Sequence, residues 1–213
     1  MSLTALLRNL ARLVVIGALV WMALHALDWL RMETGPAGMT ALALLLLIYM
    51  LVLATPFMPG VEIGLAILAM KGADAAPFVW AATIVGLSLA WAFGRWLPTP
   101  WIISALRDLR LNGLADTVTR ISGEPPELRL HYLCQRAPNW LGRILRDWRY
   151  VALALLMNLP GNAVVGGGGG LAMLAGLSRI FAPGATLLTF VIGTAPIPLL
   201  VWFFGPGILP WTV

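Results

Sequence analysis

One acidic residue stands alone in a long apolar stretch. Glu62 comes two residues after the pair Pro59-Gly60, and no other charged residue occurs between Thr34 and Met70. Burial penalises the ionised form of a carboxyl group, so an acid in such a stretch suits the uptake and release of a proton. Glu62 is therefore the first candidate for a proton or cation site. In the other interpretation, Glu62 meets water or caps the N-terminus of a helix.

Two amide side chains bracket a second proline-glycine pair. Asn158 and Asn162 lie on either side of Pro160-Gly161 in another uncharged stretch. Their amides can contact a substrate head group, or reach Glu62 from the other half of the chain. They can equally satisfy backbone groups that Pro160 leaves without partners. The sequence does not decide between these roles.

A run of five glycines, Gly166 to Gly170, precedes a helix that we expect to begin near Leu171. Successive backbone N–H groups at a helix start can hold an anion. Glycines also permit close helix packing without any ligand. Packing is favoured, and anion binding stays open.

Other residues with chemical potential do not combine into a catalytic or metal-binding set. His25 and His131 have no partner at a metal-ligand spacing, and Cys134 is the single cysteine. No Ser-His-Asp arrangement or pair of catalytic carboxylates can be assembled. We therefore expect no enzyme, no metal and no cofactor.

The composition places these residues in a membrane. Of 213 residues, 60% are hydrophobic and 11% are charged, and uncharged apolar runs recur along the chain. About 20 such residues in a helix cross the hydrocarbon layer. The net charge of +5 fits cytoplasmic loops better than nucleic acid, because no separate basic patch is present.

The charges predict the course of the chain through the membrane. Arg8 and Arg12 put the N-terminus in the cytoplasm, before a first transmembrane helix over 10–30. The basic segment 95–149 is expected to be cytoplasmic and amphipathic. Arg95 and Arg179 mark helix ends on that side, where they can meet lipid phosphates.

The two apolar regions on either side of the basic segment share one plan. In 39–94, a hairpin broken at Pro59-Gly60 enters from outside and a crossing helix follows. In 150–205, a hairpin broken at Pro160-Gly161 enters from the cytoplasm, again followed by a crossing helix. Such opposed halves predict an inverted repeat. The expected fold is one all-α integral membrane domain over 1–213, with two inverted repeats of a re-entrant broken hairpin plus a transmembrane helix.

The motifs resemble the DedA family and the wider VTT-domain (SNARE-associated Golgi protein-like) superfamily. The matching elements are Phe57-Met58-Pro59-Gly60 with an acid close behind, then Lys71-Gly72, then Gly94-Arg95 at a helix end. The resemblance covers roughly 40–205. It implies opposed re-entrant hairpins in a multi-pass protein of the bacterial inner membrane. It also implies transport or flipping of a polyprenyl phosphate or phospholipid, with protons as the coupled ion.

The sequence departs from that family at several positions. Val61 separates the acid from Pro-Gly, a second family acid falls near Tyr49, and a Gly-Asp pair reads Gly86-Leu87. The arginines of the second hairpin are replaced by Met157, Asn158 and Asn162, which weakens the case for a phosphate-bearing substrate.

Together these patterns favour a membrane transporter or lipid translocase of the flippase or scramblase type. Its substrate or proton site would combine the following residues: Glu62, Tyr49, Pro59, Gly60, Asn158, Asn162, Pro160 and Gly161. The alternative is a non-transporting membrane factor that binds lipid or a partner protein through its Arg-rich cytoplasmic segment. Assembly into a homo-oligomer stays open.

Overall fold

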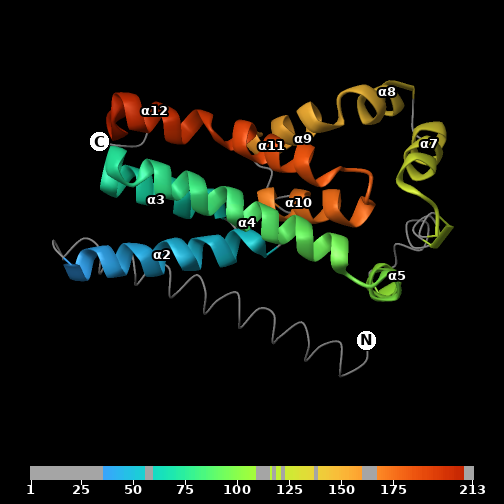
Figure 1. The fold of residues 1–213 in the computed structure, drawn as a ribbon, viewed down its shortest axis with the longest axis horizontal. Helices are drawn as coiled ribbons and strands as arrows, with labels where there is room; N and C mark the ends of the chain where they lie inside the picture. The colour runs from blue at the N-terminus through green and yellow to red at the C-terminus, as the bar shows by residue number, and fades with distance from the viewer. Residues whose placement is uncertain are drawn as a thin grey trace.

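The computed structural model describes residues 36–55, 60–108, 116, 119–120, 123–136, 139–159 and 167–208, and these residues form helices with no strand among them. Figure 1 shows their arrangement. The longer helices, in chain order, are α2 (Pro36–Ala54), α3 (Gly60–Lys71), α4 (Ala76–Trp96), α5 (Thr99–Asp108), α7 (Pro126–Arg136), α8 (Asn139–Asp147), α9 (Arg149–Asn158), α10 (Gly167–Ser178), α11 (Pro183–Thr194) and α12 (Pro196–Phe204). The all-α class expected from the sequence is confirmed for this part of the chain.

Helix α4 lies at the centre of the fold and packs against α2, α10, α11 and α12. Its contact with α10 depends on glycines. A Cβ atom added at Gly94 would collide with the carbonyl oxygen of Met173, and one added at Gly176 would collide with the carbonyl oxygen of Trp91. The two helices therefore approach to backbone contact, which larger residues at these positions would prevent.

Three other helix ends meet at the middle of α4. Leu53, near the end of α2, lies against Gly86 of α4. An ideal Cβ atom built on Gly86 would be 3.2 Å from the Cβ atom of Leu53. The first residue of α3, Gly60, is buried against the same leucine. Near the start of α10, an ideal Cβ on Gly168 would be 3.3 Å from the side chain of Leu87. Breaks far apart in the sequence thus converge at one level of α4.

Helix α10 begins earlier than expected, at Gly167 rather than near Leu171. Gly167 has a φ of 68°, a conformation that favours glycine, and it is buried with the three glycines that follow. A Cβ atom at Gly169 would collide with the carbonyl oxygen of Leu53. Close packing thus offsets the poor helix propensity of glycine, and it explains Gly167 to Gly170 without a ligand.

Two described segments are long and apolar enough to cross a membrane: α4, and the pair α11–α12 over 183–204. The second segment has a break at Ala195, which the sequence analysis did not anticipate. Pro196 and Pro198 have no N–H group to donate to the preceding turn, so the backbone hydrogen bonds are interrupted there.

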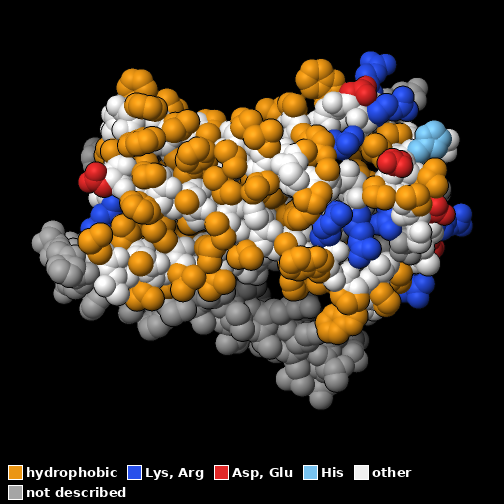
Figure 2. All heavy atoms as spheres, in the orientation of Figure 1, with side chains coloured by type: hydrophobic (Ala, Val, Ile, Leu, Met, Phe, Trp, Pro, Cys, Tyr) orange, Lys and Arg blue, Asp and Glu red, His pale blue; other side chains and the backbone are white. Residues whose placement is uncertain are grey.

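The outer surface of the helices is largely apolar. Figure 2 shows hydrophobic side chains over most of the visible face of the helical body, with charged side chains gathered mainly at the end formed by α5, α7 and α8. Exposed apolar side chains on the long helices include Phe78, Phe93, Leu188, Ile192, Phe203 and Phe204.

The helices expected before and after Pro59-Gly60 correspond to α2 and α3. The helix expected before Pro160-Gly161 corresponds to α9. The first helix expected over 10–30 lies outside the described residues. So do both hairpin tips, 56–59 and 160–166.

Candidate functional site

A cavity of about 370 Å³ lies where the helix ends converge, with walls from α2, α3, α4, α9, α10, α11 and α12. Most of its lining is apolar. Polar side chains from separate helices also face it: Tyr49, Glu62, Thr83, Asn158 and Thr194. A largely apolar cavity with a few polar groups is typical of small-molecule binding sites.

Tyr49 supplies a buried hydroxyl at this cavity. Its oxygen lies 2.7 Å from Oγ1 of Thr83, and Thr83 donates its own hydrogen to the carbonyl oxygen of Val79 at 2.7 Å. Because a threonine hydroxyl has one hydrogen, Tyr49 is the donor in the bond between the two side chains. The lone pairs of the Tyr49 oxygen therefore remain available to accept a hydrogen bond from a ligand.

Gly64 makes room for this hydroxyl. An ideal Cβ atom on Gly64 would lie 2.8 Å from the Tyr49 oxygen, closer than a carbon normally approaches. Gly64 also lines the cavity, two residues after Glu62 on the same helix. The absence of a side chain at Gly64 thus brings the hydroxyl of α2 against the helix that carries the acid.

Glu62 lies in the first turn of α3 and lines the cavity, but its side chain is exposed. The structure therefore places the carboxyl where the cavity opens and does not enclose it. Within the described part of the chain it forms no ion pair with a basic side chain.

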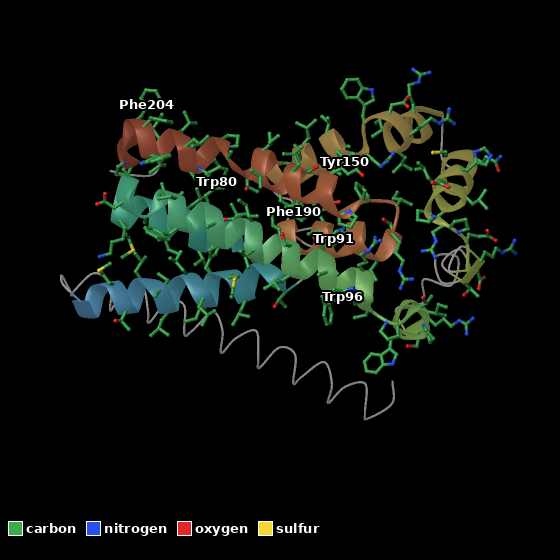
Figure 3. The ribbon with its side chains drawn as sticks, in the orientation of Figure 1. Trp80, Trp91, Trp96, Tyr150, Phe190 and Phe204 are labelled. Carbon is green, nitrogen blue, oxygen red and sulfur yellow. The ribbon has the colours of Figure 1, made fainter. Side chains whose placement is uncertain are left out.

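Asn158 of α9 forms a hydrogen bond with the last turn of α11, next to the break between α11 and α12. Its Nδ2 atom donates to the carbonyl oxygen of Ala154 at 2.8 Å and to that of Gly193 at 2.7 Å. On the other side, Nε1 of Trp80 donates to the carbonyl oxygen of Val191 at 3.2 Å (Figure 3). Asn158 thus satisfies the backbone carbonyls of Ala154 and Gly193, while Pro160 lies outside the described residues. Both bonds use Nδ2, and Oδ1 accepts from no donor in the described part of the chain, so it can accept from a ligand.

The structure brings together three of the residues selected from the sequence: Glu62, Tyr49 and Asn158. Gly60 lies beside them, buried against Leu53. The remaining candidates, Pro59, Pro160, Gly161 and Asn162, lie outside the described residues.

Two threonines of the cavity were not predicted from the sequence. Thr83 and Thr194 lie in apolar helices. The hydroxyl of each donates to the carbonyl oxygen four residues earlier, Val79 for Thr83 and Phe190 for Thr194, at 2.7 Å in both cases. A hydroxyl satisfied by its own helix can be buried at little cost. Threonines within otherwise apolar stretches were the signal that could have found them.

Arg95 and Arg179 lie away from the cavity, at the end of α4 and just after α10. Nη1 of Arg95 donates to the carbonyl oxygen of Phe181 at 3.5 Å, which joins these two helix ends. A third arginine, Arg129 of α7, is buried close to both. Burial lowers the pKa of Arg129, and the positive charges of Arg179 and Arg95 lower it further. We call Arg95, Arg129 and Arg179 the basic cluster.

Among the described residues, no three His, Cys, Asp or Glu side chains lie close enough together to hold a metal ion. Comparison with protein-family models, curated proteins and solved structures finds no match to this chain. The cavity and the basic cluster are the features of the described residues that bear on its function.

Proposed function

We propose that this chain is an integral membrane protein that moves a lipid or its head group between leaflets, with the central cavity as the substrate site. Two long apolar segments and an apolar outer surface support the membrane location. Exposed hydrophobic surface of this extent is unfavourable in water and is expected where lipid chains are the solvent.

The position of the cavity at the middle of α4 is the observation that carries this proposal. Helix α4 has 21 residues, so it is roughly 30 Å long, the thickness of the hydrocarbon layer. Gly86 and Leu87 lie at its middle, where the ends of α2, α3 and α10 meet. Broken backbone near the centre of a bilayer is tolerated where it is shielded by protein or lines a cavity.

The opposed course of the two halves gives further support. In Figure 1, α2 runs toward the middle of the body from one end, and α9 runs toward it from the other, with α4 and α11–α12 alongside. This arrangement fits an inverted repeat of α2–α4 and α9–α12. In such repeats the substrate site is found near the midplane, between discontinuous helices.

The polar groups of the cavity suit a transient head group. The acceptor oxygens of Tyr49 and Asn158 and the carboxylate of Glu62 would replace part of the hydration that a head group loses. Glu62, at the opening, is the group that can take up a proton during the cycle. The remaining wall is apolar and suits the lipid chain.

The experiment is leaflet exchange of a fluorescent phosphatidylglycerol in vesicles containing the purified chain. Glu62→Gln should slow protein-dependent exchange at least tenfold and remove its dependence on pH. Glu127→Gln is a matched control, because Glu127 is also an exposed acid in the first turn of its helix, α7, away from the cavity. Equal exchange rates in both variants and the unmodified protein would exclude Glu62 from the mechanism.

A second candidate function is binding of lipid or a partner protein by the basic segment. It is favoured by two exposed arginines on the amphipathic helix α8, Arg143 and Arg146. In that case Arg143→Gln with Arg146→Gln would abolish biological function in cells, whereas Glu62→Gln would leave it intact. The transport proposal predicts the reverse.

A further inference from the structure

The uncharged polar side chains of the central cavity have already used their hydrogen-bond donors within the protein. Tyr49 donates to Thr83, and the hydroxyl of Thr83 donates to its own helix. Thr194 also donates to its own helix, and both N–H groups of the Asn158 amide donate to backbone carbonyl oxygens. A hydroxyl has one hydrogen and an amide has two, so these four side chains have none left for a ligand.

Acceptor oxygens at the cavity, in contrast, remain open. The hydroxyl oxygen of Tyr49 on α2, the carboxylate of Glu62 on α3 and Oδ1 of Asn158 on α9 accept from no donor in the described part of the chain. They come from three separate helices around one cavity. A molecule held by these side chains must therefore supply the donors itself.

The helix ends around the cavity do not turn this balance toward anions. N-termini of α3, α10 and α12 carry partial positive charge, and C-termini of α2, α9 and α11 carry partial negative charge, so three ends of each sign largely offset one another. Pro196 and Pro198 also remove two N–H groups from the first turn of α12. The lining residues at these ends are Val61, Gly168 and Ile197 for the N-termini, and Leu53, Leu159 and Thr194 for the C-termini.

The charged side chains favour a cation. The described residues that line the cavity include the acid Glu62 and no basic residue. Lys71 is at the opposite end of α3, and the basic cluster is on α7 and near the ends of α4 and α10. An anion in the cavity would lose water without gaining a positive partner, whereas a cation would meet a carboxylate.

We infer that the cavity binds a primary ammonium group, the head of an amphiphilic amine that has no phosphate, with the hydrocarbon chain against the apolar wall. The inference rests on the proposed function and names the substrate class of the same site. A primary ammonium has three N–H donors and one positive charge, which match the three open acceptors and the single carboxylate. A quaternary ammonium has the charge without the donors, and a phosphate brings further acceptors with the wrong charge.

The test is thermal unfolding of the purified full chain in nanodiscs of dioleoyl phosphatidylcholine, a lipid whose head group has no hydrogen-bond donor. Dodecylamine, dodecyltrimethylammonium or dodecyl phosphate is added at the same mole fraction, so that the hydrocarbon chain is constant. Dodecylamine should raise the unfolding temperature, and the other two additives should not.

Variants assign this effect to the cavity. Glu62→Gln and Tyr49→Phe each remove one acceptor with little change of shape, and each should weaken the dodecylamine effect about tenfold in apparent affinity. Glu127→Gln, at an exposed acid of α7 away from the cavity, is the control that should keep the effect.

Other outcomes contradict the inference. An equal shift with dodecyltrimethylammonium would show charge recognition without hydrogen bonding, and an equal or larger shift with dodecyl phosphate would show a site without preference for cations. No shift with dodecylamine would refute an ammonium site. A dodecylamine shift unchanged in Glu62→Gln and Tyr49→Phe would place amine binding elsewhere.

Failure of this inference is distinguishable from failure of the proposed function. Exchange of phosphatidylglycerol tests the proposed function separately, since the glycerol hydroxyls of that lipid can also donate to the open acceptors. Slower exchange in Glu62→Gln without a dodecylamine shift would leave the proposed function standing and refute the ammonium site. A dodecylamine shift without any protein-dependent exchange would leave the site standing and refute transport.

Discussion

The hydroxyl of Tyr49 donates to Oγ1 of Thr83 across 2.7 Å, which connects α2 to α4 at the wall of the central cavity. This bond fixes the position of the only tyrosine hydroxyl that faces the cavity among the described residues.

Tyr49→Phe should lower stability modestly and slow lipid exchange strongly. The loss of one interhelical hydrogen bond in a membrane protein costs about 1 kcal/mol. Exchange should fall further than stability, because the variant also removes an acceptor for the head group. Thermal unfolding and vesicle exchange measure the two effects. Tyr150→Phe is the control: its hydroxyl accepts from the N–H of Ala182 away from the cavity, so exchange should continue.

Gly64→Ala should displace the Tyr49 hydroxyl, because the new Cβ atom would lie 2.8 Å from it. Overpacking at a buried site typically costs about 1–3 kcal/mol. In Gly184→Ala, the added Cβ atom meets nothing within 4 Å, so stability should stay the same or rise slightly. Similar unfolding temperatures for the two variants would show that Gly64 and Tyr49 are not in close contact.

Asn158→Leu should loosen the joint between α11 and α12. The carbonyl oxygen of Gly193 would lose the donor that now lies 2.7 Å away. A carbonyl oxygen that loses its donor where lipid, not water, surrounds the helix has no replacement partner, which costs about 1 kcal/mol. Hydrogen exchange of the amides over 190–199 should accelerate. Gln135→Leu, an exposed amide on α7, should leave that segment unchanged.

Gly94→Ala and Gly176→Ala should each separate α4 from α10. In both cases the added methyl group would meet a backbone carbonyl, which cannot rotate away as a side chain can. We expect a loss of about 2 kcal/mol or more in unfolding free energy. Gly123→Ala, with open space around it, serves as the comparison. A normal unfolding temperature in Gly94→Ala would contradict this packing.

The sequence was most informative where a local physical rule acts. An apolar helix can be read from composition. The Pro-Gly pairs lie at helix boundaries, at the start of α3 and just after the end of α9, because proline removes a backbone donor. The break at Ala195 was missed although Pro196 and Pro198 are visible, because the hydrophobic run continues through it. The start of α10 was missed since glycine is a poor helix former unless close packing compensates, and packing is not visible in sequence.

The candidate site could be predicted only in part. An isolated acid such as Glu62 is conspicuous, whereas Thr83 is hidden among apolar residues. Arg129 belongs to a segment with many arginines, and nothing local distinguishes the one that lies near Arg95 and Arg179. Long-range placement of this kind depends on how the helices pack.

The central claim is that the chain breaks at the middle of the bilayer, and the depth of spin labels tests it most directly. With Cys134 replaced by serine, labels would be attached at four exposed apolar positions: Val61 near the start of α3, and Phe78, Val85 and Phe93 along α4. Label depth is measured from the ratio of its collision rates with oxygen and with a water-soluble nickel complex. We expect the label at position 61 to be as deep as that at 85, and deeper than those at 78 and 93. A label at position 61 with the shallow depth of position 78 would contradict it.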